Sequence, residues 1–174
     1  MPDLLWAQVE DWFNPDPCLN GSAPDIWVRE VSADDWQAVL DLIRSKGWAY
    51  GYTEDGQARR LPAASEMITR NSRAGVGLWV TPAPGFTVDF YPHTADEISC
   101  DVSLHELQGQ DRLDQLCVFL RAVGRRLRKP VVMTPEGDRD LDLLGYQVGT
   151  DRVIMLAGPY HEPDPLAVQF LTAW

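Results

Sequence analysis

The sequence predicts an α+β fold: a mostly antiparallel sheet, built from a central meander and a C-terminal hairpin, with two main helices packed on one face. Three observations support this. Residues 76–104 contain three runs of alternating apolar and polar side chains, residues 110–129 repeat apolar side chains at helical spacing, and residues 146–156 alternate around a glycine. Strands joined by short turns pair antiparallel, and an amphipathic helix buries its apolar stripe against such a sheet.

The first 24 residues are predicted to form a short helix and a proline-rich loop. The apolar residues of the helix are Leu4, Leu5, Val9, Trp12 and Phe13. The sequence Asn-Pro-Asp-Pro at residues 14–17 ends it, because the residue before a proline disfavours helical geometry. This helix could dock on its own domain or on a partner, and docking on its own domain is favoured because exposed tryptophans promote aggregation.

The next segment reads as a strand, a helix and a second strand. Residues 26–31 form the first strand, and Ser32 caps a helix that ends at Gly47. The apolar positions of this helix are Trp36, Val39, Leu40 and Ile43. Residues 48–53 alternate aromatic and small side chains, which is typical of a strand with one aromatic face. A further helix is predicted at residues 61–71, with Pro62 in its first turn.

The meander follows. Its three runs place on one side Val76, Leu78, Val80, Phe86, Val88, Phe90, Ile98, Cys100, Val102 and Leu104. Residues 82–85 and 92–96 supply the turns.

The segment from residue 110 to residue 134 predicts a long helix that leads into a buried strand. The core stripe of the helix consists of Leu113, Leu116, Cys117, Leu120, Val123 and Leu127, and Pro130 stops the helix. Residues 131–133 are a short apolar run, and residues 146–156 form a hairpin that turns at Gly149 and Thr150. We predict a single domain over residues 1–174, with an α+β core at 25–158 and a Pro-rich tail at 159–174.

Charge and composition narrow the class of function. The formal net charge is −11, and phosphate groups repel so acidic a chain, which disfavours nucleic acid and anionic membrane as partners. Residues 110–129 carry six basic and two acidic residues, but arginines at a helix C-terminus usually complement the helix dipole. The three cysteines form no Cys-x-x-Cys pair, and no apolar stretch is long enough to span a bilayer, so we expect a cytoplasmic protein.

Catalysis and metal binding are less favoured. His93 and His105 lie a strand's length apart and form no metal-ligand pair, while Cys100 and Cys117 fall on apolar faces. We therefore predict no catalytic residue, no metal and no cofactor. Whether the protein is an enzyme stays undecided, with a non-enzyme favoured; the alternative is a small-molecule-binding or hydrolytic domain with a pocket near Glu136.

The polar side of the meander carries the candidate partner-binding residues. These are Trp79, Asp89, Tyr91, Glu97 and Asp101. Aromatic side chains among carboxylates are typical of protein interfaces, although such a face could also be simply solvated or covered by the N-terminal helix. We expect a non-catalytic, acidic, intracellular domain that binds another, basic protein, such as a toxin that it neutralises in the manner of an immunity protein. The oligomeric state is not determined by the sequence.

Overall fold

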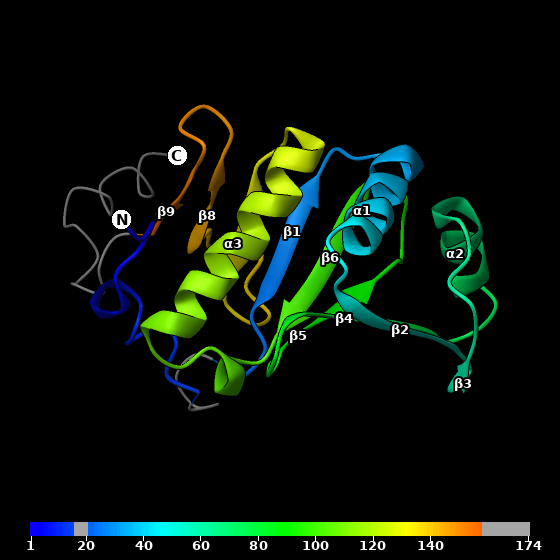
Figure 1. The fold of residues 1–174 in the computed structure, drawn as a ribbon, viewed down its shortest axis with the longest axis horizontal. Helices are drawn as coiled ribbons and strands as arrows, with labels where there is room; N and C mark the ends of the chain where they lie inside the picture. Colours follow the sequence, from blue (N-terminus) through cyan, green and yellow to red (C-terminus); the bar gives the residue numbers. More distant parts are fainter. Residues whose placement is uncertain (16–20, 158–174) are drawn as a thin grey trace, which may run out of the picture.

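A computed structural model of the protein describes residues 1–15 and 21–157, and it contains one antiparallel sheet of nine strands (Figure 1). The strand order is β3-β2-β4-β5-β6-β1-β7-β8-β9, and every neighbouring pair is antiparallel. The strands are β1 (Asp25–Arg29), β2 (Ala49–Glu54), β3 (Gln57–Ala58), β4 (Val76–Ala83), β5 (Phe86–Tyr91), β6 (Glu97–Val102), β7 (Val131–Thr134), β8 (Leu144–Gln147) and β9 (Arg152–Met155). The predicted fold class is confirmed, including the meander β4-β5-β6 and the hairpin β8-β9.

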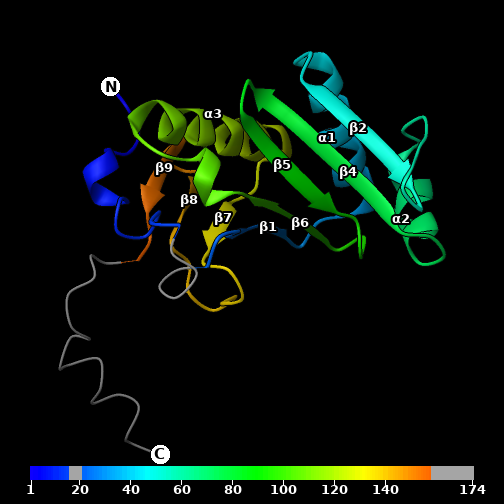
Figure 2. The same cartoon turned by 90° about the horizontal axis from the view of Figure 1, so that it is seen from below.

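The helices lie on one face of this sheet. They are α1 (Ala33–Ser45), α2 (Ala64–Asn71) and α3 (Gln110–Leu127), with short 3-10 turns η1 (Trp6–Gln8) and η2 (Leu104–Glu106). In Figure 1, α3 and α1 stand in front of the central strands with α2 beside α1, and Figure 2 shows α3 above β7 and β8. The opposite face of the sheet carries no helix in the described part of the chain.

Local chemistry explains where the two main helices begin and end. The Ser32 hydroxyl accepts a hydrogen bond from the Asp35 backbone N–H, and the Asp35 carboxylate accepts one from the Ser32 N–H, which forms a capping box at the start of α1. Helix α3 ends at Leu127, because Arg128 adopts a left-handed conformation with φ of 56° ahead of Pro130.

The core lies between the helices and the sheet. The predicted stripe of α3 is buried, with Leu120 fully so, and it packs against the apolar sides of the strands. Tyr146 of β8 lies against α3 at Gly124, where an added Cβ would approach the tyrosine ring to 2.0 Å. Apart from Trp27, the buried apolar residues of the described chain form one continuous cluster, so the fold depends on a single core.

The N-terminal segment differs from the prediction. Instead of a helix over residues 4–13, it forms only the three-residue turn η1. Four of its predicted apolar residues, Leu4, Val9, Trp12 and Phe13, are still buried, whereas Leu5 is exposed. Asp3 forms an ion pair with Arg121, and the Trp6 N–H donates to the Gln110 side chain. The segment therefore docks on its own protein, next to α3. No helix within residues 1–15 and 21–157 is long and apolar enough to cross a membrane.

Candidate functional site

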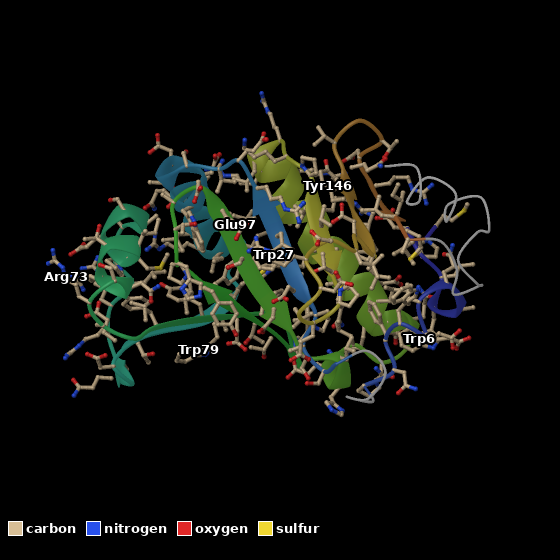
Figure 3. The ribbon with its side chains drawn as sticks, turned by 180° about the vertical axis from the view of Figure 1, so that it is seen from behind. Trp6, Trp27, Arg73, Trp79, Glu97 and Tyr146 are labelled. Carbon is tan, nitrogen blue, oxygen red and sulfur yellow. The ribbon has the colours of Figure 1, made fainter. Side chains whose placement is uncertain are left out.

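The side of the sheet opposite the helices, here called the open face, gathers aromatic and acidic side chains. Strand residues alternate between the two faces, so those between the buried core positions point away from the helices. Figure 3 views this side and shows Trp27 and Glu97 over neighbouring strands, with Trp79 toward the far end.

Three aspartates stand side by side across three adjacent strands of the open face. Asp89 of β5 is directly opposite Asp101 of β6, which is directly opposite Asp25 of β1. Facing side chains in an antiparallel pair have Cβ atoms about 5 Å apart, and like charges at that distance repel. None of the three forms an ion pair with a residue that the structure describes. We call these three residues the carboxylate row.

The pKa of each member of the row is raised above its ordinary value, and the charges of the other two members contribute to this only for Asp101. Partial burial is the main cause that raises the pKa of Asp101, and the charges of Asp89 and Asp25 raise it further. Burial likewise raises the pKa of Asp89, with Glu106 adding to the effect. For Asp25, burial raises the pKa, although the Gly137 N–H opposes this. Each carboxylate is therefore more costly to ionise than a solvated one.

Exposed aromatic rings flank the row on its meander side. Trp79 is opposite Asp89 and is 39% exposed. Its indole lies over the backbone of Gly51 on β2, where an added Cβ would be 2.0 Å from the ring, so only glycine fits. Tyr91 is 37% exposed, donates to Asp101 Oδ2 at 2.7 Å and stacks on the His93 ring.

A groove of about 470 Å³ opens beside the row, between Tyr91 and Trp27. The Trp27 indole N–H donates to the Thr134 hydroxyl at 3.0 Å, which fixes the ring. The guanidinium of Arg139, from the loop between β7 and β8, lies 4.0 Å from the centre of that ring and pairs with Glu97 at 2.5 Å. Aromatic rings and carboxylates are thus the chemical groups that line this groove.

The five residues predicted as partner-binding all lie on the open face. Register places Trp79, Asp89 and Asp101 in one row across the strands, and Tyr91 one row further along. Glu97 is on the same face, but Arg139 already neutralises it. Their role in binding stays a prediction.

Sequence reasoning missed three residues of this site, namely Asp25, Trp27 and Arg139. Residues 25–29 read Asp-Ile-Trp-Val-Arg, with three apolar residues in a row, so no polar-apolar alternation marks the outward direction of Asp25 and Trp27. Nor does the sequence reveal that β1 pairs with β6, and only this pairing completes the row.

The other candidates were Glu136, the cysteines and a metal site, and the structure favours none of them as a site of catalysis. The Glu136 carboxylate accepts hydrogen bonds from the Ser22 and Ala23 backbone N–H groups, which lowers its pKa and ties two loops together. Burial raises the pKa of the Cys117 thiol to about 12. Among the described residues, no group of three or more His, Cys, Asp or Glu side chains is arranged to hold a metal ion.

A second hollow, of about 810 Å³, lies near α2 and is basic. Four arginines line it: Arg44, Arg59, Arg60 and Arg70. Carboxylates already hold two of them, because Arg44 pairs with Asp41 and Arg70 pairs with Glu54 and Glu66. Its local charge is therefore largely compensated, unlike that of the carboxylate row.

Comparison with known proteins adds no assignment. The chain matches no protein-family model, and no curated protein is significantly similar to it.

Proposed function

We propose that this protein binds a positively charged protein through the open face of its sheet, without catalysis of its own. The observation that supports this best is the carboxylate row, in which three adjacent aspartates form no ion pair with a described residue. A partner's lysines and arginines would relieve the mutual repulsion of these groups, so complex formation gains energy from a cost already present in the free protein.

The aromatic residues supply the second component of such an interface. Carboxylates act mainly on the approach of the partner, whereas desolvated aromatic side chains slow its departure. Trp79 and Tyr91 stand beside the row and are more than one third exposed, so their rings are available to a partner. Neutralisation of a basic toxin, in the manner of an immunity protein, is the form of this function that the acidic charge favours.

The test is capture of the partner, followed by kinetics with charge variants. Immobilised protein is exposed to a lysate of the native cells, and the captured protein is purified and rebound. We expect a basic protein, and we expect Asp89→Asn with Asp101→Asn to lower the association rate constant about tenfold at low salt.

The matched control changes the net charge by the same amount, but on the helical side of the sheet. Asp34→Asn with Asp111→Asn neutralises two exposed carboxylates on α1 and α3. We expect this pair to change the association rate less than about twofold, since the charges point away from the open face. An equal slowing by both pairs, or a partner that binds both as well as the parent, would refute the proposal.

A further inference from the structure

The groove on the open face already holds one guanidinium of the protein itself. Arg139 places its guanidinium 4.0 Å from the centre of the Trp27 ring and bonds to the Glu97 carboxylate. A planar cation held between an aromatic face and a carboxylate is a favourable arrangement for arginine, because its delocalised charge stacks and its N–H groups fork toward oxygens. At this end, the walls of the groove therefore hold a guanidinium between an aromatic ring and a carboxylate.

The other end of the groove presents the same kinds of group, and its two aspartates form no ion pair with a described residue. Tyr91 supplies an exposed ring, and its hydroxyl occupies Oδ2 of Asp101. The remaining Oδ1 has no hydrogen-bond donor among the described side chains and backbone groups. Asp25 is directly opposite Asp101, so a second carboxylate borders the same space.

The spacing of the walls suits a flat side chain. Tyr91 and Trp27 lie in the same row across the strands, with Ser99 of β6 between them. Adjacent strands are about 4.8 Å apart, so the two aromatic residues start about 10 Å apart at the backbone. The small serine side chain leaves the floor between them low, which gives the groove its depth.

We propose that this groove selects arginine over lysine on the basic partner. The partner's guanidinium stacks on the face of the Tyr91 ring that does not stack on His93, and it donates hydrogen bonds to the carboxylates of Asp101 and Asp25. A lysine ammonium carries the same charge, but it can neither stack as a plane nor donate two parallel hydrogen bonds. The inference rests on the proposed function and names the partner side chain that the open face recognises.

The experiment uses matched peptides as probes. Three fluorescein-labelled nonapeptides share a Gly-Ser background and contain three arginines, three lysines or no charge. Binding to the full-length protein is measured by fluorescence anisotropy at low and at physiological salt. We expect the arginine peptide to bind at least about fivefold more tightly than the lysine peptide, with the difference retained at higher salt.

Two variants locate the preference in the groove. Asp101→Asn removes the charged acceptor and Tyr91→Leu removes the ring, so each should reduce the arginine-to-lysine ratio to about one. Tyr91→Phe keeps the ring and should keep most of the preference. The control pair Asp34→Asn with Asp111→Asn should leave the ratio unchanged, and circular dichroism melting verifies that every variant is folded.

The outcomes separate this inference from the function on which it rests. Equal binding of arginine and lysine peptides, both above the uncharged peptide, would overturn arginine selection and leave a charge-reading face. Binding of neither charged peptide above the uncharged one would refute both proposals. A preference that survives in both Asp101→Asn and Tyr91→Leu would place arginine recognition outside this groove.

Discussion

The two faces of the sheet follow the same alternation and have opposite energetics. On the helix side, apolar residues of β4, β5 and β6 are buried in one continuous cluster, so each contact lowers the free energy of the folded protein. On the open face, the intervening positions of the same strands carry Asp89 and Asp101, which face each other and repel. One face stabilises the fold, and the other carries a repulsive pair of carboxylates.

This contrast indicates which surface of the protein is suited to binding. Natural proteins tolerate local destabilisation where a surface must bind, because groups suited to a partner are often unsuited to the free protein. The basic hollow near α2 lacks this character, since carboxylates compensate Arg44 and Arg70.

Truncation of the core should have the largest effect. Leu120→Ala removes a fully buried side chain from α3 and should lower the free energy of unfolding by about 2 to 5 kcal/mol, because it loses transfer energy and leaves a cavity. Urea denaturation measures the change. Val118→Ala, on the exposed side of the same helix at 58% exposure, is the control and should cost less than about 0.5 kcal/mol. Similar losses in the two variants would mean that the helix is oriented differently.

Truncation of an aromatic residue on the open face should weaken binding without lowering the stability of the fold. Tyr91→Ala should weaken the complex with the captured partner by about 1 to 4 kcal/mol, mainly through faster dissociation, because an aromatic anchor is desolvated only in the complex. Surface plasmon resonance resolves the two rates. Tyr50→Ala provides a comparison, since Tyr50 is similarly exposed at 42% but lines the basic hollow. If Tyr50→Ala accelerates dissociation as much as Tyr91→Ala does, the open face is not the binding surface.

Short-range sequence patterns predicted the elements well. Alternation between residues 76 and 104 predicted three strands with the correct side buried, and helical spacing placed Leu120 in the core. These patterns depend on nearest neighbours along the chain, so a single sequence contains them. The N-terminal helix failed for a related reason: a segment of about ten residues gains little from helix formation alone, and packing against α3 decided its shape.

Long-range pairing could not be predicted in the same way. Strand β1 inserts between β6 and β7. Between the end of β6 at Val102 and the start of β7 at Val131 lie 28 residues, which include the helix α3. That insertion alone brings Asp25 next to Asp101 and Trp27 next to the groove. The five predicted residues of the open face all lie in the meander and could be found from its alternation. The third aspartate of the carboxylate row, Asp25, is brought there only by the tertiary fold.

The smallest expected effect is a gain in stability, because the substitution removes a repulsion between two carboxylates. Asp89→Asn eliminates one charge beside Asp101 and should raise the free energy of unfolding at pH 7 by about 0.5 kcal/mol, within the range for cross-strand pairs. Asp151→Asn is the opposite control: Arg125 and Tyr146 lower the pKa of Asp151 to about 2, so its neutralisation should destabilise the protein.

The pH dependence follows from the direction of each pKa. The folded-state pKa of Asp89 is raised above 3.8, mainly by burial, so the folded chain binds this proton more tightly than the unfolded chain does. Stability from this group is greatest below pH 3.8 and falls as the pH rises through the folded-state value. The gain in stability from Asp89→Asn should therefore be present at pH 7 and vanish below pH 3.8.

The control Asp151→Asn should behave in the opposite way. Its loss of stability should be present above pH 3.8 and fade as the pH falls to about 2. Thermal melts of the parent and both variants across this range measure the differences. If Asp89→Asn destabilises the protein at pH 7 as Asp151→Asn does, the carboxylate row is compensated like the rest of the surface, and the contrast between the two faces fails.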